Sequence, residues 1–148
     1  MAREPPIADL VQDQVQKGLP VRLVVGGWSM APLIWPGATV TIVRCDAGAL
    51  RAGDVAAVAS RGHVVCHLVT RVEWTAEGLW VHTRGLTNRG CDPPVPESCC
   101  IGRVAEVQSG PVGFRTDGRA FRAWRLVASG LARPLGWLRR RLHATLRR

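Results

Sequence analysis

The 148-residue sequence lacks the long apolar run that marks an integral membrane protein. No stretch reaches the ~20 uninterrupted apolar residues that a bilayer-spanning helix needs. Segment 1–10 has early charges and two prolines in place of an apolar run. We therefore expect neither a signal peptide nor a membrane anchor at this end, and no integral membrane protein.

The cysteines lack a pattern that would indicate a metal site or a disulfide framework. There are five of them, an odd number, and they show no repeated Cys-x-x-Cys spacing of the kind found in zinc sites. The sequence also shows no internal repeat. We expect free, reduced thiols, no bound metal and no cofactor.

Acidic residues are scarce at the C-terminal end. Residues 115–148 contain 10 of the 20 basic residues but only one of the 11 acids, Asp117, so the remaining 114 residues sum to zero charge. An anionic partner is therefore expected at this basic arm and not at the core.

The length and the 47% hydrophobic content fit one core-bearing domain with extensions. Residues 1–20 predict a short lead-in helix, because apolar residues follow the helical period from Ile7 to Val15 before Gly18 and Pro20 end it. Residues 21–110 are β-rich, with expected strands at 21–25, 39–43, 55–59, 63–72, 79–83 and 101–107. Turn residues separate these segments, so we predict a mainly β domain with a small antiparallel sheet or partly open barrel.

Residues 111–148 predict a basic amphipathic helical arm. After Gly113 the apolar residues recur at alternating steps of three and four, and the arginines lie largely off that stripe. Pro134 has no N–H group, so we expect it to kink or divide this helix.

The segment GGWSMAP at 26–32 places Ser29 on a tight turn directly after a strand. The glycines there allow another backbone to approach closely. Further motifs follow in a fixed order: Pro36-Gly37, Gly53-Asp54-Val55, His67 in a strand ending Arg71-Val72, Thr83-Arg84-Gly85, Asp92, and Ile101-Gly102-Arg103-Val104.

This series, over about residues 21–107, resembles the signal peptidase family, whose serine-bearing β fold is shared by LexA-like self-cleaving repressors. The resemblance implies a signal-peptidase/LexA-like fold and a serine endopeptidase that cuts leader or signal-like peptides after small residues. The serine of the family's Ser-Met-x-Pro box, here Ser29, attacks the scissile carbonyl. The implied partner is a peptide or preprotein substrate.

The family uses two kinds of base. Its bacterial branch uses a lysine, whereas the branch found in the endoplasmic reticulum, archaea and some bacteria has a histidine within a His-Arg-Val strand. The sole lysine here, Lys17, lies in the lead-in helix, so only a histidine is available. An imidazole, with an ordinary pKa of about 6.5, is mostly neutral at pH 7 and can accept the serine proton. His67 matches the family's element, and the competing histidines are His63, His82 and His143.

Asp92 is the best candidate for a third member that orients the histidine, since it occupies the position of the family's loop aspartate. It can equally be a turn former before Pro93. Asp54 is interpreted mainly as the turn aspartate of Gly-Asp-Val, with a smaller chance of touching the site.

An oxyanion hole needs donors aimed at the developing negative charge. The backbone N–H of Ser29 is the expected donor. Many bacterial relatives add a hydroxyl two residues earlier, where this chain has Gly27, so a second donor must come from the backbone or be absent. With Gly27, we assign Met30 and Pro32 to the expected oxyanion and substrate-binding set.

Two departures from the family pattern keep a second hypothesis open. The family usually has an arginine directly after this histidine and an aspartate directly after this glycine. At those two positions, after His67 and Gly85, this chain has Leu68 and Leu86. The alternative is therefore a weak or inactive relative that binds peptides without cutting them. A self-cleaving repressor ranks low, because about 20 residues precede the core, too few for a helix-turn-helix domain, and the lysine base is missing.

For the arm, two interpretations are nearly balanced: a helix that packs its stripe on the domain, and peripheral membrane contact through residues 119–148. Arginines suit an anionic surface, and Trp124 and Trp137 suit the headgroup boundary. Nucleic-acid binding is the least favoured alternative. We accordingly favour a peripheral membrane-associated protein over a soluble cytoplasmic one.

Overall fold

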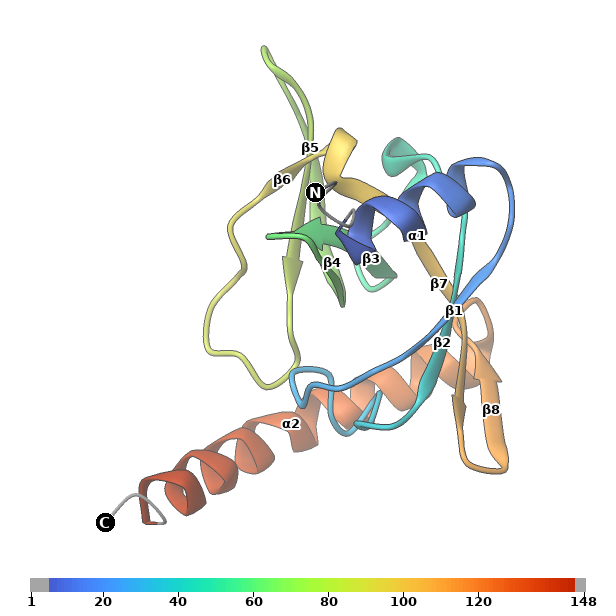
Figure 1. Cartoon of the computed structure of the whole chain (residues 1–148). Helices are drawn as coiled ribbons and strands as arrows, with labels where there is room; N and C mark the ends of the chain where they lie inside the picture. Colours follow the sequence, from blue (N-terminus) through green and yellow to red (C-terminus); the bar gives the residue numbers. More distant parts are fainter. Residues whose placement is uncertain (1–5, 146–148) are drawn as a thin grey trace, which may run out of the picture.

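The computed structural model describes residues 6–145 and is mainly β, with one helix at each end of the chain (Figure 1). Eight strands form one antiparallel sheet in the order β1-β2-β7-β3-β4-β5-β6, with β8 paired to β7. The sheet curves into a half-barrel. The strands are β1 (Val21–Val24), β2 (Thr39–Val43), β3 (Val55–Ser60), β4 (His63–Thr75), β5 (Gly78–Arg84), β6 (Val95–Pro96), β7 (Cys100–Ser109) and β8 (Val112–Arg115).

Alternation of side chains along the strands builds two hydrophobic clusters, one on each side of the sheet. The larger cluster includes Ile42, Val55 and Val104, and the smaller one includes Val58 and Val81. The predicted antiparallel half-open sheet is therefore confirmed. Short 3-10 helices, η1 (Ala47–Ala49) and η2 (Glu97–Cys99), connect strands at the rim.

The predicted lead-in helix is present as α1 (Ile7–Gln16). Its buried residues Ala8, Val11 and Val15 recur at the helical period and pack into the larger cluster. The helix ends at Gln16, and Gly18, two residues further on, has a φ of 82°, in the left-handed region that favours glycine.

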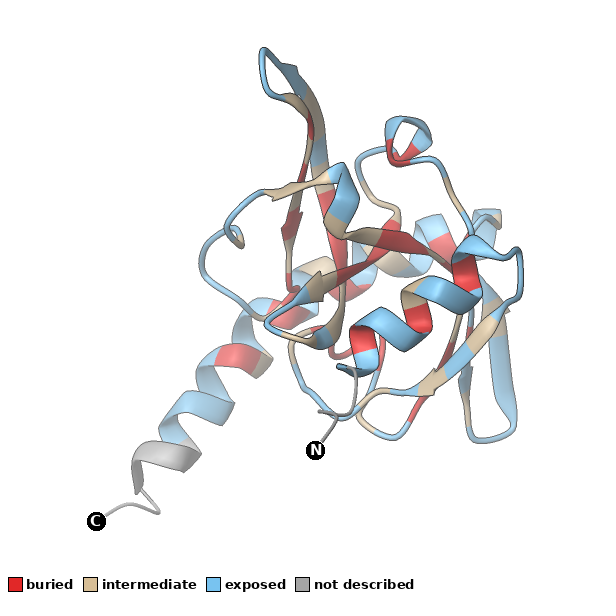
Figure 2. Ribbon diagram, turned by 45° about the horizontal axis from the view of Figure 1, so that its top comes forward, coloured by how far each residue is buried: buried red, intermediate tan, exposed pale blue. Residues whose placement is uncertain are grey.

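The C-terminal helix α2 (Arg119–Thr145) crosses the end of the half-barrel and then extends past it, as Figure 1 and Figure 2 show. Phe121, Ala128 and Ala132 are buried in the larger cluster. The helix continues through Pro134 and is not divided there, contrary to one of the two outcomes we expected. Pro134 has no N–H group to donate to the Gly130 carbonyl. Because Gly130 is exposed, water can bond to that carbonyl instead.

Three further features differ from the sequence prediction. Strands β6 and β8 were not expected, and β8 occupies the first residues of the predicted arm, where a turn at Gly110 with φ of 57° forms a hairpin. Strand β4 runs on to Thr75 instead of ending at residue 72.

Among the described residues, no helix is long and apolar enough to cross a membrane.

Candidate active site

Ser29 lies in the tight turn that follows β1, as the sequence predicted. The turn is closed by the Ala31 N–H, which donates to the Trp28 carbonyl at 3.1 Å. The next turn is closed by the Ile34 N–H, which donates to the Met30 carbonyl at 2.9 Å, and the side chains of Met30 and Ile34 are buried. From the other side, the Thr87 N–H donates to the Ser29 carbonyl at 3.0 Å. A β-carbon at Gly85 would lie 3.1 Å from the Ser29 β-carbon, closer than an ordinary van der Waals contact, so the glycine lets this loop approach the serine closely.

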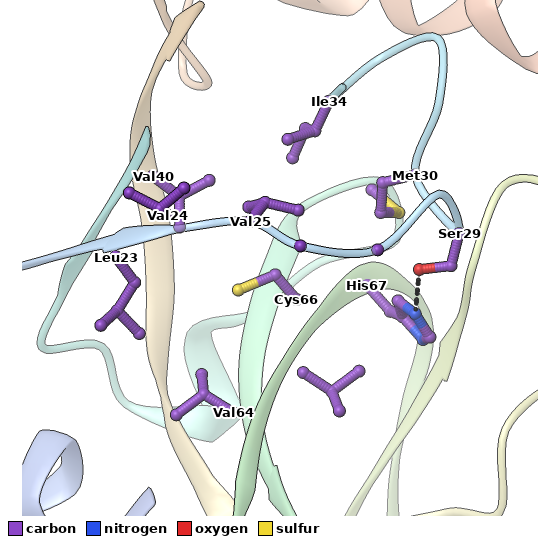
Figure 3. A pocket seen from close by; sticks show the side chains of 13 residues that line it. Leu23, Val24, Val25, Ser29, Met30, Ile34, Val40, Val64, Cys66 and His67 are labelled. Carbon is purple, nitrogen blue, oxygen red and sulfur yellow. Dashed lines mark hydrogen bonds between the residues drawn. The ribbon is translucent and has the colours of Figure 1, made fainter. Parts of the chain in front are cut away.

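The hydroxyl of Ser29 meets the ring of His67, which projects from β4 (Figure 3). The distance between Ser29 Oγ and His67 Nε2 is 2.9 Å, and the histidine is only 7% exposed. The two residues are 38 positions apart in the chain, so the curvature of the sheet is what brings them together. This distance is short enough for direct transfer of a proton.

Asp92 lies at the opposite edge of the same imidazole. Its Oδ2 atom is 2.5 Å from His67 Nδ1, so with the ring proton on Nδ1 that N–H donates to the carboxylate and Nε2 is left to accept from Ser29. The Asp92 backbone N–H donates to the Thr83 carbonyl at 2.9 Å. The structure thus brings Ser29, His67 and Asp92 into one hydrogen-bonded line.

Thr83 also belongs to this site, a role that its place in the Thr83-Arg84-Gly85 motif did not predict. Its hydroxyl donates to Asp92 Oδ2 at 2.8 Å, and the residue is 2% exposed. A signal for it was present in the strand pattern. Thr83 shares the inward face of β5 with Leu79 and Val81, and a polar residue on a buried apolar face needs a hydrogen-bond partner.

Of the competing histidines, His63 and His82 do not contact Ser29. His63 is exposed at the first position of β4. His82 Nε2 is 3.0 Å from Glu73 Oε2 on the neighbouring strand. The side chain of His143 lies outside the described residues. Of the candidate bases whose side chains are described, only His67 is hydrogen-bonded to the serine.

Asp54 is a turn residue in the structure. Its Oδ2 atom accepts from the Arg51 N–H at 2.9 Å, which closes the turn before β3. Leu68 and Leu86, which stand where the family usually has charged residues, are 8% and 5% exposed and pack in the larger hydrophobic cluster. Their departure from the family pattern therefore places apolar side chains in the core next to the site.

A pocket of about 380 Å³ opens beside the serine and the histidine (Figure 3). It is lined by residues 23–27 and 64–67 together with Ser29, Met30, Ile34 and Val40. A β-carbon at Gly27 would meet no atom within 4 Å, so the backbone there borders open space. Of the predicted oxyanion and substrate-binding set, Gly27 and Met30 line this pocket. Pro32 does not; it is buried and lines a second groove.

Two strand edges face each other across this pocket without a strand partner in the described chain. Strand β1 pairs only with β2, so its other edge is open. Residues 63–67 of β4 pair with β3 on one side, whereas pairing with β5 begins only at Leu68. Unpaired edges of this kind can accept an added strand.

Cys66 is the one other nucleophilic side chain that lines the pocket. Burial raises the pKa of its thiol to about 12, so the thiol is protonated at neutral pH and is a poor nucleophile. All five cysteines are free thiols. Among the described residues no cluster of histidine, cysteine and acidic side chains could hold a metal ion.

Comparison of the sequence with protein-family models finds no match, and no curated protein matches it either. Function is therefore inferred from the geometry of Ser29, His67, Asp92 and Thr83 and from the pocket beside them.

Proposed function

We propose that this protein is a serine endopeptidase of the signal-peptidase type, with a fold of the signal-peptidase/LexA-like kind. The observation that carries the proposal is the line from Ser29 through His67 to Asp92 at the mouth of an apolar pocket flanked by two open strand edges. A nucleophile, a base and a group that orients the base are the parts that acyl transfer by serine requires.

The proposed substrate is an extended peptide that enters as an added strand between residues 24–27 and 64–67. Its backbone hydrogen-bonds to the open edges, and its alternate side chains point into the pocket. The labelled side chains in Figure 3 are mostly apolar, including Val25, Met30 and Ile34. This lining favours small apolar residues at the positions that face it, in line with cleavage after small residues.

The reaction begins when Ser29 Oγ attacks the scissile carbonyl carbon and its proton passes to His67 Nε2. Asp92 stabilises the imidazolium that forms, and the Ser29 backbone N–H is the expected donor to the oxyanion. The imidazolium then gives its proton to the leaving amine, which leaves an ester between Ser29 and the N-terminal fragment. Water attacks this ester, with His67 again as base, and releases the acid and the free serine.

Leu68 and Leu86 favour a second candidate, a relative that binds peptides without cutting them. Both are buried where the family usually has charged residues. In this structure, however, Asp92 and Thr83 already supply a carboxylate and its support on the far side of His67. The endopeptidase is therefore the better-supported proposal.

The experiment is mass spectrometry of the products that the purified protein releases from a peptide library. We expect Ser29→Ala and His67→Ala each to abolish cleavage. The matched controls are Ser60→Ala, an exposed serine at the end of β3, and His63→Ala, an exposed histidine on the same strand as His67; both should cleave like the wild type. Full activity in either Ser29→Ala or His67→Ala would rule out the proposed pair.

A further inference from the structure

Two exposed tryptophans extend from the serine turn. Trp28, which directly precedes Ser29, is 49% exposed, and Trp35 at the end of the same turn is 40% exposed. Their rings meet edge to face with centroids 5.7 Å apart. Exposed aromatic side chains in contact with each other indicate a surface that binds something.

This surface continues onto helix α2. Trp35, Trp124 and the exposed Val112 of β8 line one apolar groove of about 320 Å³. On α2 the exposed Trp124, Val127 and Leu131 are spaced by three and four residues, which keeps them on one side of the helix, whereas the exposed Leu126 lies on the other side. We call this surface the tryptophan patch; its members are Trp28, Trp35, Val112, Trp124, Val127 and Leu131.

The charge of α2 indicates what covers the patch. The helix contains seven arginines and no acidic residue. Arg122, Arg133 and Arg140 are exposed and are spaced by 11 and seven residues, so they form a line on the side of the helix away from the patch stripe. A second copy of the chain on this patch would bring two such helices together and repel. An anionic surface instead complements the charge.

Tryptophan rings suit the boundary between lipid headgroups and acyl chains, because one end is apolar and the other carries an N–H donor. A helix with an exposed apolar stripe and arginines on its polar face is typical of a segment that lies in the plane of that boundary. Trp137, on the arginine side, has the Arg141 guanidinium 4.5 Å above its ring.

We propose that the tryptophan patch and helix α2 bind the surface of an anionic lipid bilayer, which holds the pocket beside Ser29 at the lipid boundary. Because Trp28 is adjacent to Ser29 in the chain, the same surface reaches the serine turn. Under the proposed function, this arrangement presents to Ser29 the part of a membrane-inserted peptide that emerges from the lipid. Lipid binding itself does not require the serine to react.

The test uses the full chain and two kinds of vesicle, pure phosphatidylcholine and phosphatidylcholine mixed with phosphatidylglycerol. Binding is measured by co-sedimentation and by the blue shift of tryptophan fluorescence. We expect the wild type to bind the anionic vesicles. The Trp35→Ala/Trp124→Ala variant should bind them at least about tenfold more weakly, because two rings no longer bury in the boundary.

A second variant, Arg122→Gln/Arg133→Gln, leaves the patch intact and removes two charges. It should lose about thirtyfold in affinity for the anionic vesicles at low salt. The matched control is Trp74→Ala, which removes a 74% exposed tryptophan near the tip of the β4–β5 hairpin, at the other end of the molecule from α2 (Figure 1). It should bind like the wild type.

The proposal is overturned if the wild type does not sediment with anionic vesicles, or if Trp74→Ala weakens binding as much as the patch variant does. It is also overturned if sedimentation equilibrium shows a dimer that the patch variant abolishes. Failed lipid binding with intact cleavage of soluble peptides would refute only this inference. Vesicle binding by wild type and Ser29→Ala without any cleavage by the wild type would refute only the proposed function.

Discussion

Replacing Thr83 with valine removes one hydroxyl from a buried site and leaves the shape of the side chain almost unchanged. In the structure that hydroxyl donates to Asp92 Oδ2 at 2.8 Å, on the same oxygen that meets His67 Nδ1. The change therefore tests whether Thr83 acts on the chemistry through Asp92. Thr83 is a positioning residue in this account, since it touches neither the substrate nor Ser29.

The size of the effect follows from the hydrogen bond that is lost. A hydrogen bond to a charged group contributes about 1.5–3 kcal/mol. If all of it were felt in the transition state, kcat/KM would fall by about 10- to 150-fold. The Asp92 side chain is 27% exposed, so water can replace part of the lost bond. We therefore expect the lower end, about a tenfold fall.

The assay measures kcat and KM separately on a cleaved peptide. Because Thr83 acts through Asp92 and touches no substrate, the loss should fall on kcat and leave KM unchanged, and Thr83→Ser, which keeps the hydroxyl, should restore kcat. The matched control is Thr116→Val, because Thr116 is also buried and its hydroxyl donates to the Val104 carbonyl at 2.6 Å, within the β7–β8 region. That variant should lose stability but keep kcat and KM. A Thr83→Val enzyme with wild-type kcat, or one whose loss falls on KM alone, would refute the role of Thr83.

Three further predictions address the site, the sheet and the thiols. Gly27→Ser should change the free energy of unfolding by less than about 0.5 kcal/mol, because the added β-carbon meets no atom within 4 Å. In the same variant, a rise in kcat would show that the added hydroxyl donates to the oxyanion. A fall in kcat would show that the hydroxyl obstructs the peptide. Gly102→Ala should destabilise the fold by about 1–3 kcal/mol in urea titrations, because its β-carbon would lie too close to the Val43 carbonyl oxygen. An unchanged urea midpoint of unfolding would contradict this packing. In iodoacetamide labelling at pH 8 the exposed Cys91 should react well before the partly buried Cys66, because the pKa of Cys66 is raised to about 12 and only the thiolate reacts. Equal labelling rates would contradict this difference between the two thiols.

The strands could be predicted where alternation and turn residues agree. Strand β2 has the predicted bounds, and the turns at Gly53 and Gly78 adopt φ values of 93° and 117° that favour glycine. Strands β6 and β8 were missed because β6 is two residues long and contains a proline, while β8 is four residues long and contains a glycine. Segments this short are held by their neighbours and carry little local signal.

The site was predictable only in part. Strand periodicity placed His67 on a β-strand, but it did not say which histidine meets Ser29, because their contact spans 38 positions and depends on how the sheet curves. Asp92 follows an irregular loop whose sequence is equally consistent with a plain turn. Asp92 is held beside His67 by two hydrogen bonds to Thr83 of β5, one from its backbone N–H and one to its carboxylate. The tryptophan patch joins residues from opposite ends of the chain, which no local pattern records.

The proposed nucleophile is tested by labelling the folded protein with a serine-reactive acylating probe and locating the modified residue by mass spectrometry. We predict stoichiometric acylation of Ser29, loss of that labelling in His67→Ala, and unchanged labelling in His63→Ala. Absence of label on Ser29 in the folded wild type, or equal labelling of Ser29 with and without His67, would contradict this prediction.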